Sequence, residues 1–290
     1  MRRFLLCLAL FASACAGAAD APVPVTPPPA SLGLDPFYAK HVDAGGIPIV
    51  GSARVPDEAL AAARQIVTAM LARRPDVRAE LVRTGQRVGV MAAEETTTDL
   101  PEHRHWRKPE PDDPRLTFCE RKTYATAIGA LSDRQYWDSR ARGTGGRLTT
   151  VGAENLLGQP GTRYFGENIL VHEFAHAILT ALETVDRALH GEVRSAYEAA
   201  LAAGKWKGDY ASVTLQEYWA EGTQYWFESN MLARLDDAEI VSAEDLGRYD
   251  PGLYAALGKV YGTSHRIAAD PFHRHAARMN VPKGYKSADC

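Results

Sequence analysis

The chain has 290 residues, of which 46% are hydrophobic and 24% are charged, and its formal net charge is -3. This length and apolar content are enough for a real core in one large domain or two small ones, which indicates a globular protein. Because charges of both signs are interspersed, the composition argues against nucleic acid and against an anionic membrane surface as partners.

The first residues have the three-part layout of an export signal. Two arginines precede an apolar run, residues 4–12, which is too short to form a stable transmembrane anchor, and small residues follow. These allow two endings: ordinary cleavage after a signal of residues 1–18, or a lipobox that ends at residue 14 and makes Cys15 the lipidated terminus. Either ending predicts an exported protein with no membrane span in the mature chain, in the periplasm, outside the cell or on the envelope as a lipoprotein.

Two cysteines remain in the mature body, Cys119 and Cys290. In an oxidising compartment two such residues most often pair, so a disulfide between them is predicted. Two unrelated thiols are the alternative, because sequence alone does not supply the geometry that a bridge requires.

Composition divides the mature chain into three parts. The proline-rich stretch 19–33 is predicted to be an extended tether. Residues 34–158 mix helix and strand patterns, whereas residues 159–290 are dominated by helices. The predicted fold class is therefore α+β, with a small sheet-containing N-terminal lobe and a helical C-terminal lobe.

The first of these lobes contains one clear helix and two short strands. Apolar residues at helical spacing predict an amphipathic helix that starts at Asp57 and ends before Pro75. Segments 86–93 and 148–151 are predicted to be strands, and the proline-rich stretch 96–115 an irregular, exposed loop. In the second lobe, helical patterns follow Glu167 and recur in the segments 192–204, 212–230 and 251–262.

Chemistry is concentrated in the segment "ILVHEFAHAIL", where His172 and His176 lie one helical turn apart on the same face. Glu173 lies between them, about a third of a turn around the helix, which suits a base that holds a water molecule better than a third ligand. This is the H-E-x-x-H arrangement of zinc hydrolases, with two imidazole ligands and a general base. The apolar residues around the three polar side chains make a surface position for them difficult to explain.

A catalytic zinc ion needs a third protein ligand and an open position. The extended motif with a third histidine is excluded, because Leu179 and Leu182 stand where it requires glycine and histidine. The segment "EYWAE" offers Glu217 and Glu221, again one turn apart, and Glu217 comes 41 positions after His176 (217 - 176). Another histidine is the remaining alternative, with no spacing argument in its favour.

Together, "HEFAH" and "EYWAE" resemble the gluzincin metallopeptidases, and most closely the catalytic domain of anthrax lethal factor and its relatives. The resemblance covers about a fifth of the chain, residues 167–227, and implies a zincin-like fold. It also implies that one zinc ion is bound by His172, His176 and Glu217, with Glu173 as the general base. In the same family, the position of Glu221 accepts a hydrogen bond from a ligand histidine. Tyr210, seven positions before Glu217, would donate a proton to the oxyanion.

The predicted function is that of an exported zinc-dependent metallopeptidase acting on a peptide or protein. Two alternatives stay open: a non-catalytic, zinc-stabilised envelope or secreted binding protein, and a zinc hydrolase of another amide or ester. The simpler interpretations of single residues also remain. Thr214 and Glu217 fit a capping box, Tyr210 could be an ordinary half-buried tyrosine, and the His-Arg-His triplets at 103–105 and 273–275 are predicted to be solvated.

Overall fold

The computed structural model describes residues 23–113, 116, 118–235 and 238–282. The predicted export signal, the lipid attachment site at Cys15 and Cys290, one partner of the predicted bridge to Cys119, lie outside the described residues, so these three features stay predictions. None of the helices in the described ranges is both long and apolar enough to cross a membrane.

A mixed sheet forms the N-terminal lobe, and its strand order among the described residues is β1-β2-β3-β5-β4. Strands β2, β3 and β5 run parallel, while β1 and β4 are antiparallel to their neighbours. The predicted tether contributes to this lobe, because Thr26 pairs with His41 of β1. The strands are β1 (Lys40–Asp43), β2 (Pro48–Gly51), β3 (Arg87–Met91), β4 (Gly143–Thr144) and β5 (Leu148–Gly152).

Helices α1 (Asp57–Met70), α2 (Pro75–Arg83) and α6 (Ala153–Leu156) accompany the sheet. The buried residues of α1 recur at helical spacing, and α1 contacts β1, β2 and α7, which confirms the predicted amphipathic helix. The sequence prediction missed α2. Its proline occupies the first helical turn, where no backbone N–H is needed, so it starts a new helix instead of only ending the previous one.

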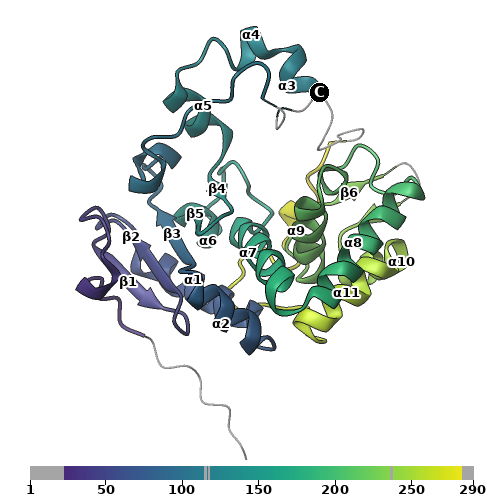
Figure 1. Ribbon diagram of the computed structural model, residues 1–290, viewed down its shortest axis with the longest axis horizontal. Helices are drawn as coiled ribbons and strands as arrows, with labels where there is room; N and C mark the ends of the chain where they lie inside the picture. Colours follow the sequence, from purple (N-terminus) through teal and green to yellow (C-terminus); the bar gives the residue numbers. More distant parts are fainter. Residues whose placement is uncertain (1–22, 114–115, 117, 236–237, 283–290) are drawn as a thin grey trace, which may run out of the picture.

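The C-terminal lobe is helical, as predicted, and is built around the pair α7 and α9, which lie side by side in Figure 1. Helices α8, α10 and α11 pack on the outer side of this pair. The elements of the lobe are α7 (Ile169–Val185), α8 (Arg187–Ala202), η4 (Tyr210–Ser212), α9 (Leu215–Trp226), β6 (Ala233–Arg234), β7 (Glu239–Ile240), α10 (Ala243–Tyr249), α11 (Pro251–Tyr261) and η5 (Ala276–Met279).

One hydrophobic core runs through both lobes. It connects Ile49 in the sheet with Phe174 in α7, Trp219 in α9 and Leu257 in α11, all of them fully buried. Each such side chain stabilises the fold by about 1.5–3 kcal/mol relative to an exposed position. The mixed α+β architecture is thus confirmed, and its two lobes share a continuous interior that fixes α7 and α9 relative to the sheet.

A smaller helical segment arches above α7 and α9 in Figure 1, and we call residues 118–141 the roof segment. It contains α3 (Phe118–Lys122), α4 (Tyr124–Ala127) and α5 (Asp133–Arg140). Ile128 and Tyr136 pack with Leu116 in a cluster separate from the main core. The roof segment therefore has a small interior of its own.

The segment predicted as an exposed loop, 96–115, is only partly exposed. Its first residues form the 3-10 turns η2 (Thr97–Asp99) and η3 (Pro101–His103), in which Thr97 and His103 are buried. Thr97 donates through its hydroxyl to the carbonyl of Ala141, at 2.6 Å. The polar residues that suggested solvent exposure instead join the roof segment to the sheet-containing lobe.

Candidate metal centre

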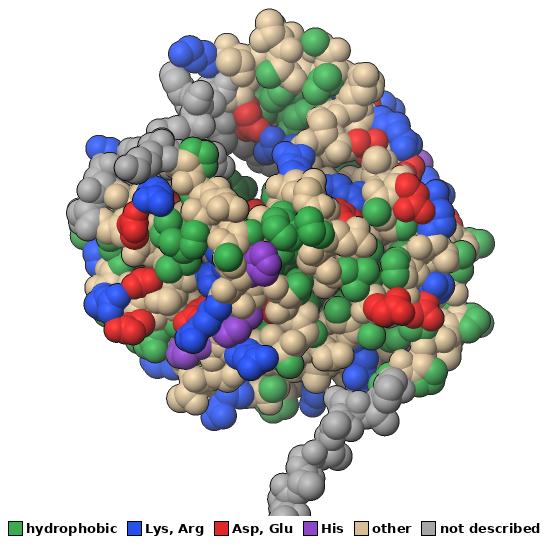
Figure 2. All heavy atoms as spheres, turned by 180° about the vertical axis from the view of Figure 1, so that it is seen from behind, with side chains coloured by type: hydrophobic (Ala, Val, Ile, Leu, Met, Phe, Trp, Pro, Cys, Tyr) green, Lys and Arg blue, Asp and Glu red, His purple; other side chains and the backbone are tan. Residues whose placement is uncertain are grey.

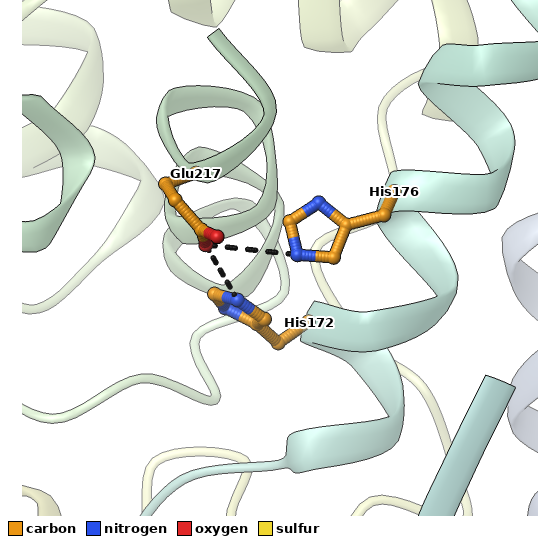
Figure 3. A group of neighbouring side chains, drawn as sticks. All are labelled: His172, His176 and Glu217. Carbon is orange, nitrogen blue, oxygen red and sulfur yellow. Dashed lines mark hydrogen bonds and ion pairs between the residues drawn. The ribbon is translucent and has the colours of Figure 1, made fainter. Parts of the chain in front are cut away.

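Helix α7 begins where Asn168 caps it, since the Asn168 side chain accepts a hydrogen bond from the Val171 amide at 3.1 Å. Most of the helix is apolar and buried, which holds it in the main core. His172 and His176 leave the helix on the same face and point toward α9 (Figure 3). Their imidazole rings stand nearly perpendicular, at 85°, with centroids 4.9 Å apart.

Helix α9 begins at Thr214, whose hydroxyl accepts from the amide of Glu217 at 3.1 Å. The threonine half of the capping box that the sequence suggested therefore forms. The carboxylate of Glu217 turns instead toward α7 (Figure 3). One Glu217 oxygen, Oε2, lies 3.0 Å from Nε2 of His172 and 3.6 Å from Nε2 of His176.

These distances suit a common metal ion. Two donors that are each about 2.0–2.2 Å from a tetrahedral zinc ion lie roughly 3.3–3.5 Å apart. One ligand atom from each of His172, His176 and Glu217 lies within 4.8 Å of the other two. Within the described part of the chain, no other group of histidine, cysteine or acidic residues meets this criterion.

The charges around the centre also favour a cation. Glu173, Glu217 and Glu221 gather here, and none of them forms an ion pair with a lysine or arginine of the described ranges. Burial raises the pKa of Glu173 to about 7 and that of Glu221 to about 8. Burial opposes the charged form of His172, but the hydrogen bond with Glu217 and the nearby carboxylates outweigh it and raise the His172 pKa to about 10. In the absence of a metal ion, the nearby carboxylates therefore favour the protonated, positively charged form of His172.

Glu173 borders the three ligand residues, with its carboxylate oxygen Oε2 3.9 Å from Nε2 of His176. Burial is the main cause of its raised pKa, and a backbone hydrogen bond from Gly145 partly offsets it. The turn after β4 brings this backbone close. A Cβ added at Gly143 would lie 2.3 Å from a methyl carbon of Ile169, so the approach of β4 to α7 depends on a glycine there.

Tyr210, in the 3-10 turn η4, reaches the same centre. Its hydroxyl donates to Oε1 of Glu217 at 3.3 Å, and its ring is roughly parallel to that of His172 with centroids 6.4 Å apart. Burial of the phenol and the charges of Glu217 and Glu173 raise the pKa of Tyr210, so it keeps its proton at neutral pH. The tyrosine remains 38% exposed, which leaves it accessible to a bound molecule.

Glu221 lies at the centre, but it is not the nearest partner of a ligand histidine. Its Oε1 is 3.5 Å from Nδ1 of His172, whereas Oε1 of Gln224 is 3.0 Å from the same nitrogen. Gln224 was not predicted from the sequence. A signal was present, because Glu217, Glu221 and Gln224 are spaced i, i+4 and i+7 and therefore share one face of α9.

A cleft of about 1650 Å³ opens above the centre. It is bordered by β4, by Tyr210, by the residues around Met231 and by Tyr136 and Trp137 of the roof segment. Figure 2, seen from behind, shows the hollow beneath this segment and shows acidic and basic side chains interspersed over that face. The cleft exceeds the range of about 300–1,000 Å³ that is usual for small-molecule pockets.

The remaining histidines do not join this centre. His103 is buried, so the prediction that it is solvated was wrong. Its ring stacks on that of Trp106 with the centroids 3.7 Å apart, and its Nδ1 contacts the carbonyl of Thr97. His105 is exposed. His273 contacts the carbonyl of Phe227 at 3.0 Å through Nδ1, and the exposed His275 caps η5.

The aromatic residues of α9 belong to the core, as expected. Trp219 and Tyr218 are fully buried, and Trp226 and Tyr225 are almost so. They fix α9 in the main core, and Tyr225 also lines the cleft.

No protein-family model and no curated protein matches the chain. A solved structure that is similar to it is that of the PRO-PRO endopeptidase PPEP-2 from Paenibacillus alvei. The similarity amounts to 17% sequence identity and a TM-score of 0.45, and it covers 73% of this chain and 96% of that one.

Proposed function

We propose that the chain is an exported zinc-dependent metallopeptidase that binds one zinc ion through His172, His176 and Glu217. The observation that carries the proposal is the convergence of these three ligand atoms beside the carboxylate of Glu173, at the base of a large cleft. The resemblance of "HEFAH" and "EYWAE" to the gluzincins supports the same conclusion and suggests a zincin-like fold.

The donor set favours a catalytic zinc ion over a structural one. Two imidazoles and one carboxylate form the three-ligand set of catalytic sites, whereas structural sites are usually closed by four protein ligands. A structural ion would also have no use for Glu173. When bound, zinc would act as a Lewis acid toward a carbonyl group and lower the pKa of water to about 7.

The chain's own residues can carry out the remaining steps of amide hydrolysis. Glu173 is placed to take a proton from the attacking water as the new carbon–oxygen bond forms, and to pass that proton to the amine as the carbon–nitrogen bond breaks. Tyr210 keeps its phenolic proton and can donate a hydrogen bond to the carbonyl oxygen as negative charge develops there. The reaction consumes one water molecule and one peptide bond and yields one carboxylic acid and one amine.

The cleft favours a peptide or protein substrate. Its volume exceeds that of usual small-molecule pockets, and β4, which lines it, is an edge strand that pairs only with β5 among the described strands. An edge strand offers backbone groups with which an extended peptide can pair.

A digest of a peptide library with the wild type and Glu173→Gln tests this function. Cleavage by the wild type, and cleavage about 10²–10⁴-fold slower by the variant at equal zinc content, is the expected result. Zinc binding without cleavage of any peptide or protein would favour the alternative, a zinc-stabilised binding protein. Cleavage of esters or other amides alone would favour a different hydrolase.

Export is a separate part of the proposal and depends on the first residues. The mass of the mature protein distinguishes a terminus after residue 18 from a lipidated Cys15. A full-length chain retained in the cytoplasm would contradict export.

A further inference from the structure

The two ring nitrogens of His172 face different partners. Nε2 faces the Glu217 carboxylate at 3.0 Å, on the side where the ligand atoms converge. Nδ1 faces away from it, toward Oε1 of Gln224 at 3.0 Å. A distance of 3.0 Å is that of an ordinary hydrogen bond, whereas the 3.5 Å from Nδ1 to Glu221 is outside the normal range.

A second hydrogen bond sets the orientation of the Gln224 amide. Its Nε2 donates to the backbone carbonyl of Asn168 at 3.0 Å. Because that carbonyl can only accept, the amide nitrogen must face Asn168 and the amide oxygen must face His172. An amide oxygen is also only an acceptor, so Nδ1 of His172 carries a proton. When the ring is neutral, Nε2 then has the lone pair that a metal needs.

Gln224 is fully buried and belongs to a network that joins three parts of the fold. Asn168, which receives its hydrogen bond, caps α7 and donates through its own amide to Oδ1 of Asp270 at 2.8 Å. Glu221 is held differently, because its Oε2 accepts from Asn230 at 2.6 Å. Of the two α9 side chains near Nδ1, Gln224 thus has its orientation set by the start of α7 itself.

We propose that Gln224 is the positioning residue of the metal centre. It fixes the ring orientation and the tautomer of His172, the role that the sequence resemblance implies for Glu221. The inference rests on the proposed function, since it concerns a histidine that binds the ion. A neutral amide in this position orients the ligand without adding another negative charge beside Glu173, Glu217 and Glu221.

The test compares Gln224→Met with Glu221→Met, which remove one acceptor each and keep the chain length. Zinc affinity is measured by competition with a chelator. Loss of the partner of a metal-bound histidine typically costs about 10–100-fold in metal affinity, and we expect a loss of this size for Gln224→Met. Gln224→Glu should retain most of the affinity, because a carboxyl buried among other carboxylates keeps its proton and then offers both a donor to the Asn168 carbonyl and an acceptor for Nδ1 of His172.

Proton NMR of the cobalt-substituted protein gives a readout of the tautomer that is independent of activity. The exchangeable Nδ1–H signal of His172 should be present in the wild type, Glu221→Met and Gln224→Glu, and should be broadened by solvent exchange in Gln224→Met. Thermal unfolding of each variant checks that it folds. If Gln224→Met does not fold, Gln224→Glu decides, because the proposal requires it to keep the signal.

Two results would overturn the inference alone: unchanged zinc affinity in Gln224→Met, or a signal that survives in Gln224→Met and disappears in Glu221→Met. A wild-type protein that binds neither zinc nor cobalt would instead remove the proposed function and this inference together.

Discussion

The metal centre and the roof segment face the same cleft but are built differently. The ligands lie on α7 and α9, whose other faces are packed in the main core, where Phe174 and Trp219 are fully buried. The roof segment packs around Ile128 and Tyr136 in a small cluster of its own. The difference predicts that α7 and α9 hold the site rigidly, whereas the roof segment, which forms one wall of the cleft, opens at a lower free-energy cost.

Glu173→Gln should give the largest effect, because it removes the base at the metal centre. Loss of a general base typically lowers the rate by about 10²–10⁴-fold, and we expect this in kcat. The zinc content should not change, since Glu173 is not among the three converging ligand residues. Peptide cleavage and metal analysis on the same sample check both points, and undiminished cleavage would remove Glu173 from the mechanism.

Tyr210→Phe comes next. Removing one donor to an oxyanion costs about 10²–10³-fold in kcat. Because the side chain is 38% exposed, the free energy of unfolding should change little. A kcat equal to that of the wild type would mean that the hydroxyl only supports Glu217.

A matched pair of substitutions tests the comparison itself. Ile178→Ala in α7 and Ile128→Ala in the roof segment remove the same atoms, and both side chains are almost fully buried, with 0% and 4% exposure. In the main core we expect a loss of about 2–5 kcal/mol in the free energy of unfolding. Ile128→Ala should cost less, because its cluster can open without the rest of the molecule. Denaturant unfolding and hydrogen exchange measure the two effects, and equal costs would show one cooperative unit.

The smallest effect should come from the helix caps. Thr214→Ala removes the cap of α9 and Ser132→Ala that of α5. Each loss costs about 0.5–2 kcal/mol of helix stability. Only Thr214→Ala should also weaken zinc binding, because Glu217 is in the first turn of α9. Equal zinc affinities of the two variants would contradict the link between the start of α9 and the metal centre.

The sequence predicted the parts of the fold that depend on local patterns. The helical spacing around Leu60 and the histidine helix are confirmed, as are the strands at 86–93 and 148–151. The segment 96–103 could not be predicted, because Thr97 and Thr98 are buried through hydrogen bonds with Ala141 and with Asp138 of α5, about 40 positions away. Helix α2 was missed because Pro75 is equally typical of a helix end and of a helix start.

The sequence predicted those residues of the candidate metal centre that are identified by their spacing along a helix. One-turn spacing indicated His172 and His176, and their approach to Glu217 agrees with the sequence hypothesis. The sequence could not predict that Gln224 lies closer than Glu221 to Nδ1 of His172, because both residues share a face of α9. The backbone carbonyl of Asn168, which orients the glutamine, is a contact that only the fold provides.

The most direct test of the central claim is a zinc titration of metal-free protein, comparing the wild type, Glu217→Ala and Glu183→Ala. Glu183 lies exposed on α7, away from the three ligand atoms, and is the matched control. We expect one equivalent of zinc with equal affinity for the wild type and Glu183→Ala, and strongly weakened binding for Glu217→Ala. A wild type that binds no zinc, or a Glu217→Ala variant that binds it as tightly as the wild type, would contradict the claim that α7 and α9 share one ion.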